Sequence, residues 1–209
     1  MSLTCEYFLA TQSPYVYLGH ARFVALARRY DVQIQLKPMD LGRVFDGSGG
    51  LPLAKRAPQR QAYRLVELAR WSKYLGVPLN LQPRFFPVSG DPSARLVIAT
   101  QLAHGTDKAL ELIGAVSKAL WVDERNIADD DTLQAIADSL SLDGKSLLAA
   151  SNGASVQAAY DANTNDAASA GVYGAPWFVF EGEPYWGQDR LDFLERAFAQ
   201  AGEVDGKTA

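Results

Sequence analysis

A hydroxyl side chain stands at the point where an expected strand gives way to an expected helix. In the stretch TQSPYVYLGH, Ser13 is followed directly by Pro14, a residue type favoured at the first position of a helix. A serine placed just before a helix ordinarily caps it, because its oxygen accepts a hydrogen bond from a free backbone N–H group. The same place has unpaired N–H groups and the positive end of the helix dipole, so it also suits a catalytic hydroxyl. The local sequence leaves both roles open.

Other reactive side chains are few. Cys5 is the only cysteine, so the chain has neither an intrachain disulfide nor a C-x-x-C pair. It alternates in step with Leu3 and Tyr7, which predicts a small buried side chain and not a nucleophile. With two histidines, His20 and His104, and no cysteine cluster, we expect no metal site. His20 lies one turn into the expected helix, where a packed or capping role is the simpler interpretation.

The composition limits the classes of partner. The chain has 209 residues, of which 48% are hydrophobic and 21% charged, as in ordinary globular proteins. The net charge of −4 and the lack of a basic block argue against nucleic acid. No stretch approaches the roughly 18 apolar residues of a membrane span, and MSLTCEYF lacks the basic and apolar regions of a secretory signal. We therefore expect a cytoplasmic protein that binds neither nucleic acid nor membrane.

The first 40 residues have a β-α-β pattern. Residues 3–10 alternate as in a strand, apolar residues then recur at helical spacing from Pro14, and VQIQLKP at 32–38 alternates strictly. After Asp40 the pattern changes. The segment at 42–58 contains four glycines and two prolines, which predicts an irregular loop.

A block of expected helices follows this loop. The first helix, RQAYRLVELARWSKYL, is expected to end at Gly76, with Tyr63, Val66, Leu68, Trp71 and Leu75 on or near one face. Five more helical segments are separated by glycine, asparagine or aspartate, and they are expected over 91–105, 107–123, 130–140, 143–152 and 154–171. None of them requires a sheet, so this block is predicted to be an all-helical unit inserted into another domain.

A second sheet signal closes the chain. PWFVFEGEPYWG is typical of a hairpin with Gly182 in its turn, and QDRLDFLERAFAQAG is expected to be a helix ending at Gly202. The whole is an α/β chain with the order β-α-β, helical insertion, β-β-α, which is the plan of a thioredoxin-like domain. We expect residues 1–57 and 172–209 to form that domain and residues 58–171 to form an inserted helical domain.

Five stretches in order, SPYVYLGH, PMDLGRVF, AYRLVELARWSKYLGVPL, GVYGAPWF and WGQDRLDFLERAF, resemble the 2-hydroxychromene-2-carboxylate isomerases. These enzymes group with the kappa-class glutathione transferases in the DsbA-like branch of the thioredoxin superfamily. The resemblance covers nearly the whole chain. It implies a fold of the DsbA and kappa-transferase type with a large helical insertion, and a cis peptide bond at Pro176 that faces the first helix.

The resemblance also implies a cofactor. Redox members of the superfamily carry Cys-x-x-Cys at the start of the first helix, where this chain has Ser13-Pro14-Tyr15-Val16. Without its own sulfur here, the chain is expected to bind glutathione, with Ser13 as the catalytic residue that donates a hydrogen bond to the thiolate. The helix N-terminus supports this expectation, because it lowers the pKa of a nearby thiol.

The remaining site residues are expected on the same resemblance. The glutathione-binding set is Ser13, Ala175, Pro176, Trp186, Gly187, Gln188 and Asp189. An aromatic 2-oxo acid needs apolar walls and cations for its carboxylate, and the expected substrate-binding residues are Lys55, Arg56 and Phe86. Phe45 stands roughly where related isomerases can carry a lysine.

The resemblance therefore implies a homodimeric, glutathione-dependent isomerase of small aromatic 2-oxo acids such as 2-hydroxychromene-2-carboxylate. It would act by reversible thiolate addition and bond rotation. Three alternatives stay open at this stage. They are a kappa-type transferase that consumes glutathione, a non-catalytic thioredoxin-like binding domain in which Ser13 is only a cap, and an isomerase of a different unsaturated acid.

Overall fold

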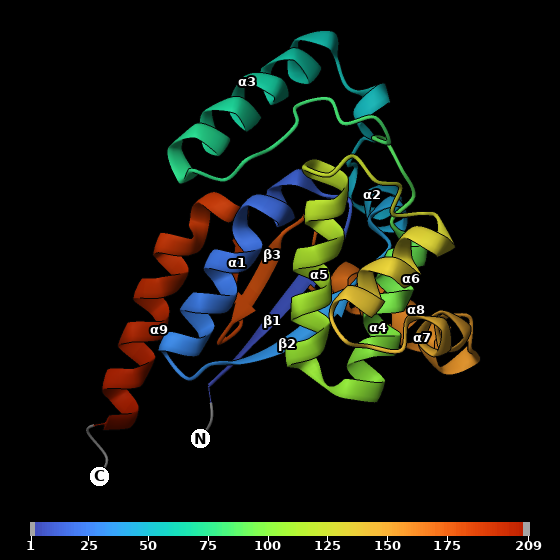
Figure 1. The fold of residues 1–209 in the computed structure, drawn as a ribbon. Helices are drawn as coiled ribbons and strands as arrows, with labels where there is room; N and C mark the ends of the chain where they lie inside the picture. The colour runs from blue at the N-terminus through green and yellow to red at the C-terminus, as the bar shows by residue number, and fades with distance from the viewer. Residues whose placement is uncertain (1–2, 207–209) are drawn as a thin grey trace.

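The computed structural model describes residues 3–206 (Figure 1). Four strands form one sheet in the order β2-β1-β3-β4. Their bounds are β1 Thr4–Leu9, β2 Gln33–Pro38, β3 Trp177–Phe180 and β4 Glu183–Trp186. β1 pairs with β2 in parallel and with β3 antiparallel, so that Cys5 lies between Ile34 and Phe180. Glu181 and Gly182, both with positive φ, form the β3–β4 turn. The predicted α/β thioredoxin-like fold is confirmed.

Helix α1, Pro14–Arg29, joins the two parallel strands. It is held on the sheet by Phe23, whose ring centroid lies 4.7 Å from that of Tyr7 and 4.5 Å from that of Phe178. All three rings are fully buried. This packing fixes the N-terminus of α1, and therefore Ser13, just beyond the end of β1.

The prediction of an irregular loop after Asp40 was wrong. The segment contains two short helices, α2 Leu41–Ser48 and the 3-10 helix η1 Leu53–Lys55. The Asp40 carboxylate caps α2 by accepting two backbone N–H groups at 2.9 and 3.1 Å, and Gly49 ends it in the left-handed conformation. Glycine-rich composition therefore concealed a helix whose two caps are both in the sequence, and which buries Val44.

The expected helices between residues 58 and 171 are all present. Their bounds are α3 Pro58–Leu75, α4 Asp91–His104, α5 Thr106–Trp121, α6 Asp130–Ser139, α7 Gly144–Ser151 and α8 Ala154–Ser169. Helices α4 to α8 gather beside the sheet, whereas α3 lies at one end of the molecule, above the N-terminus of α1 (Figure 1).

Helix α3 ends before Gly76, as expected, but most of its apolar residues are not buried. Only Leu68 is buried in this helix, while Tyr63 and Val66 are 58% and 49% exposed. Apolar spacing alone therefore indicated the helix but not what its sides contact.

The C-terminal part follows the hairpin. The 3-10 helix η2, Gln188–Arg190, leads into α9, Leu191–Gly206, which continues past the expected end at Gly202. Buried Phe198 packs edge-on against Phe180 of β3, at a centroid distance of 4.7 Å, and so fixes α9 to the sheet.

One buried cluster contains sheet residues together with residues of α4 to α8. The helical block therefore packs directly on the thioredoxin-like part, and the boundaries 1–57, 58–171 and 172–209 stay a prediction. Cys5 is fully buried, as expected, and burial raises the pKa of its thiol. His20 is a core residue that bonds the Tyr7 hydroxyl and the Leu110 carbonyl oxygen. None of the helices within 3–206 has the length and apolar character required to cross a membrane.

Candidate active site

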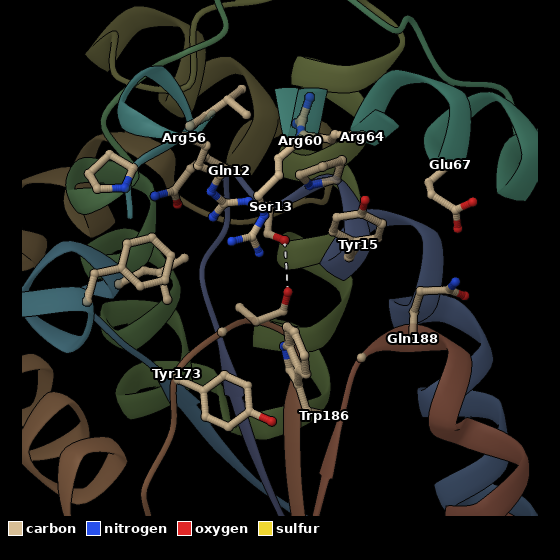
Figure 2. Close-up of a pocket in the computed structure, with 18 of the residues that line it drawn as sticks. Gln12, Ser13, Tyr15, Arg56, Arg60, Arg64, Glu67, Tyr173, Trp186 and Gln188 are labelled. Carbon is tan, nitrogen blue, oxygen red and sulfur yellow. Dashed lines mark hydrogen bonds between the residues drawn. The ribbon is translucent and has the colours of Figure 1, made fainter. Parts of the chain in front are cut away.

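A cavity of about 810 Å³ lies where the first turn of α1 faces α3. Its walls come from α1, α2, α3, the chain around residues 86–88, the segment before β3, and the end of β4 with η2. The volume lies in the upper part of the range of roughly 300–1,000 Å³ typical of small-molecule sites. Figure 2 shows that the labelled side chains of these segments surround Ser13.

Ser13 forms two hydrogen bonds with its hydroxyl. The oxygen accepts from the Val16 N–H group at 3.3 Å, which is the N-cap bond of α1. The hydrogen is donated to the Ala175 carbonyl oxygen at 3.2 Å, drawn as the dashed line in Figure 2. A hydroxyl has one hydrogen to donate, so Ser13 can donate to a ligand only by releasing Ala175. It lies on the cavity wall and is 8% exposed.

The peptide bond between Ala175 and Pro176 is cis, as the resemblance implied. Ala175 lines the cavity opposite Ser13, whereas Pro176 is buried behind the wall and is not a lining residue. The Pro176 carbonyl oxygen accepts the Gly187 N–H group at 3.0 Å. This bond ties the segment before β3 to the segment that follows β4.

Trp186, Gly187, Gln188 and Asp189 all line the cavity, as expected. Gly187 has a φ of 104°, a conformation that favours glycine. The Trp186 indole is 48% exposed and packs edge-on against Tyr173, with centroids 4.7 Å apart. The Asp189 carboxylate pairs with its neighbour Arg190 at 2.8 Å.

Gln188 is fixed from behind by α1. Arg22 donates to its side-chain oxygen at 2.9 Å and to its main-chain oxygen at 3.3 Å. An arginine has no acceptor, so the amide oxygen must face Arg22 and Nε2 must point away. That nitrogen is buried and has no hydrogen-bond partner in the part of the chain that the structure describes. A Cβ at Gly19 would collide with Gln188, so a glycine here permits the close approach of η2 to α1.

The three expected substrate residues separate in the structure. Arg56 and Phe86 line the cavity, together with Phe45, but Lys55 does not. Lys55 is the last residue of η1 and is exposed. Arg56 follows as the C-cap, and its Nε donates to the Leu51 carbonyl oxygen at 2.7 Å. Adjacent residues of a helical turn point in different directions. The Arg56 side chain therefore reaches the cavity, whereas that of Lys55 points away from it.

The polar residues of the wall that sequence reasoning missed include Tyr15, Arg60, Arg64 and Glu67. The arginines follow Arg56 at four-residue intervals, a spacing that aligns side chains on one side of a helix. That regularity was the available signal. In Figure 2 the three arginines lie above Ser13, and Tyr173 and Trp186 lie below it.

These arginines make one side of the cavity positive. Burial lowers the pKa of the Arg64 guanidinium, and the charge of Arg56 lowers it further. Arg56 has a lowered pKa for the same two reasons, burial and then the charge of Arg60. Burial raises the pKa of Tyr15, although the charge of Arg64 opposes the rise. Tyr15 is therefore a protonated donor at neutral pH. Within residues 3–206, no three side chains of metal-binding type come together.

Comparisons with known proteins agree with this geometry. Residues 4–199 match the family described as the DSBA-like thioredoxin domain. The chain is similar to the 2-hydroxychromene-2-carboxylate isomerase of Sphingobium xenophagum, with 28% identity over 93% of this chain and 97% of that protein. It is also similar to glutathione S-transferase kappa 2 of Caenorhabditis elegans, with 26% identity over 92% of each chain. A solved structure of 2-hydroxychromene-2-carboxylate isomerase superimposes on this chain with a TM-score of 0.83 at 23% identity. The superposition covers 99% of this chain and 100% of that one. The chain belongs to the DsbA-like thioredoxin domain family.

Proposed function

We propose that the protein is a glutathione-dependent isomerase of aromatic 2-oxo acids of the 2-hydroxychromene-2-carboxylate type. One observation carries the proposal: the Ser13 hydroxyl lies on the cavity wall at the N-terminus of α1, 3.2 Å from the Ala175 carbonyl oxygen. Redox relatives place a cysteine there. The only cysteine of this chain, Cys5, is buried in β1, so a sulfur at this position must come from a bound thiol.

The cavity wall has the donors and acceptors that glutathione requires. Ser13 and the free N–H groups at the N-terminus of α1 suit a thiolate. Gln188 also lines this wall, but its Nε2 is buried, so a ligand carboxylate could reach this donor only if the side chain turned toward the cavity. The Asp189 carboxylate suits an ammonium group, for which it would leave Arg190. We therefore assign the Ala175 and Trp186–Asp189 side of the cavity to the tripeptide.

Bound glutathione would supply a thiolate that adds reversibly to a conjugated carbon of the substrate, so that the former double bond rotates before the thiolate leaves. The role of Ser13 is to keep this sulfur ionised. Its hydrogen would move from the Ala175 carbonyl oxygen to the sulfur, while its oxygen keeps the N-cap bond to Val16. Arg56 and Phe86 would bind the carboxylate and the ring of the substrate, and the structure gives no support for such a role of Lys55.

Two alternatives have specific support. The similarity to a kappa-class transferase favours an enzyme that consumes glutathione, and the amount of glutathione left after many turnovers distinguishes it from an isomerase, which regenerates the thiol. A non-catalytic binding domain is favoured by the fact that both hydrogen bonds of Ser13 are made within the protein. The expected homodimer and cytoplasmic location stay predictions.

Thermal unfolding with and without reduced glutathione tests the proposal. A ligand that binds only the folded state raises the melting temperature in proportion to the logarithm of its concentration. We expect such a rise with reduced glutathione. The analogue in which the sulfur is methylated should stabilise the protein much less, because it has no thiolate to receive the Ser13 hydrogen. An unchanged melting curve at saturating glutathione would contradict both the isomerase and the transferase.

A further inference from the structure

Arg64 has an orientation that suits a ligand of the cavity. Its guanidinium carbon lies 5.0 Å from the centroid of the Phe86 ring and 5.8 Å from that of Trp121. The two rings pack against each other with centroids 4.8 Å apart, and Trp121 is fully buried. The aromatic pair therefore holds the plane of the guanidinium through cation–π contact. Its N–H groups are left for hydrogen bonds with another molecule.

The cations on this side lack carboxylate partners. In the described part of the chain, no carboxylate lies within 4.0 Å of Arg60 or Arg64. The two acidic residues of the wall are engaged elsewhere, since Glu67 pairs with Arg70 and Asp189 pairs with Arg190. Arg64 is partly buried, whereas Arg60 is exposed. A partly buried cation without a counter-charge is costly, so a ligand that supplies negative charge is favoured beside Arg64.

Tyr15 adds a neutral donor beside Arg64. It is the second residue of α1, two positions after Ser13, and it lines the same cavity. It is close enough to Arg64 for each to affect the ionisation of the other. Figure 2 shows Tyr15 extending from α1 toward the side of the cavity that carries Arg64 and Glu67.

We propose that Tyr15 and Arg64 form a keto-oxygen subsite, and that Arg60 joins Arg56 in the adjacent carboxylate subsite. A 2-oxo acid carries its keto oxygen and its carboxylate on neighbouring carbons, so its recognition needs two groups of donors side by side. Arg60 and Arg64 are four residues apart on α3, a separation of about 6 Å along the axis. The aromatic ring of the ligand would then lie against Phe86. The inference rests on the proposed function, and it assigns the keto oxygen and the carboxylate of the 2-oxo acid to separate residues of the wall.

A pair of unreactive probes tests the subsite without glutathione. Phenylpyruvate carries the keto group, and 3-phenylpropionate has the same ring and carboxylate without it. We expect the wild type to bind phenylpyruvate at least about tenfold more tightly, the value of one charge-assisted hydrogen bond, as measured by calorimetry. Tyr15→Phe and Arg64→Gln should each abolish most of this preference. Arg60→Gln should weaken both probes by a similar factor, because both carry the carboxylate.

Two matched controls are available. Tyr17→Phe removes a hydroxyl from the same helix, but Tyr17 donates to the Pro78 carbonyl oxygen and does not line the cavity. Arg84→Gln removes an arginine that stacks on Phe85 at 5.1 Å, also outside the cavity wall. Both controls should keep the wild-type preference. Because the readout is a ratio of two affinities on one protein, a general loss of stability does not imitate the result.

Equal affinity of the wild type for the two probes would overturn the inference, and so would a preference that survives in both Tyr15→Phe and Arg64→Gln. The glutathione-induced rise in melting temperature, measured on the same variants, judges the proposed function separately. If this rise is present while the preference is absent, the isomerase proposal stands and the keto-oxygen subsite fails. If the preference is present without the rise, the subsite stands and glutathione dependence fails.

Discussion

Replacing Ser13 by alanine separates a helix cap from a catalytic hydroxyl. The substitution removes two hydrogen bonds, to Val16 and to Ala175, with lengths of 3.3 and 3.2 Å. The cap is worth about 1 kcal/mol, and the bond to the carbonyl oxygen about as much again. At about 2–4 °C per kcal/mol for a chain of this size, the melting temperature should fall by no more than about 8 °C. The variant therefore stays folded at an assay temperature of 25 °C.

Turnover responds differently in the two roles. If Ser13 stabilises a thiolate, loss of its donor should lower kcat by roughly 100-fold, as for other groups that stabilise a developing anion. We would measure the isomerisation of 2-hydroxychromene-2-carboxylate at saturating glutathione. The matched control is Asp129→Ala, which removes the N-cap of α6, where Asp129 accepts the Thr132 N–H group at 2.9 Å. The control should lose stability and keep its kcat.

A kcat of Ser13→Ala within a few-fold of the wild type would refute the catalytic reasoning. Ser13 would then be a cap of α1 and nothing more. A second instructive variant is Ser13→Cys, which restores a sulfur at this place but creates a competing thiol. We expect it to lose dependence on glutathione concentration, since its own thiolate would fill the position.

Further predictions concern single side chains. Burial lowers the pKa of His20 from 6.5 to about 4. Between these pH values His20 is protonated in the unfolded state and neutral in the folded state. The free energy of unfolding should therefore fall by about 3 kcal/mol as the pH drops from 6.5 to 4. In His20→Gln, the free energy of unfolding measured by urea titration should not show this fall with pH. Cys5, buried and with a raised pKa, should resist alkylation by iodoacetamide until the protein unfolds; rapid native labelling would contradict its burial. A Cβ on Gly174 would collide with the Trp186 indole, whereas one on Gly47 meets open space. Gly174→Ala should therefore weaken glutathione binding in calorimetry and Gly47→Ala should not, and equal affinities would remove Trp186 from the site.

The sequence predicted the fold where local signals and packing agree. The strand, proline and helix order around Ser13, and the turn at Gly182, needed no information from distant residues. Helix α2 was missed because its glycines argued for a loop, although Asp40 and Gly49 supply both of its caps. The side of α3 that faces the cavity was missed for a different reason. Apolar spacing identifies a face that enters a core, whereas this helix turns arginines toward a ligand cavity.

The site was predictable only in part, for geometric reasons. Ser13 and Ala175 are 162 residues apart. The family resemblance implied that the cis proline faces the first helix, but no pattern predicted the hydrogen bond between Ser13 and Ala175. Lys55 and Arg56 have the same charge and adjacent positions, so sequence could not show that only Arg56 reaches the cavity. The stacking of Arg64 on Phe86 depends on how α3 lies over the chain around residue 86, a tertiary relation without a local signal.

In the proposed mechanism, the N-terminus of α1 holds the sulfur of glutathione as an anion next to Ser13. The most direct measurement is the ultraviolet absorbance of the thiolate in the complex of protein and glutathione, titrated against pH. The pKa of a free thiol is about 8.5. We expect the bound thiol of the wild type to ionise well below this value, so that thiolate absorbance is present at neutral pH. In Ser13→Ala the pKa should return toward the free value. A bound thiol with an unshifted pKa, or the same lowered pKa in both proteins, would contradict this mechanism.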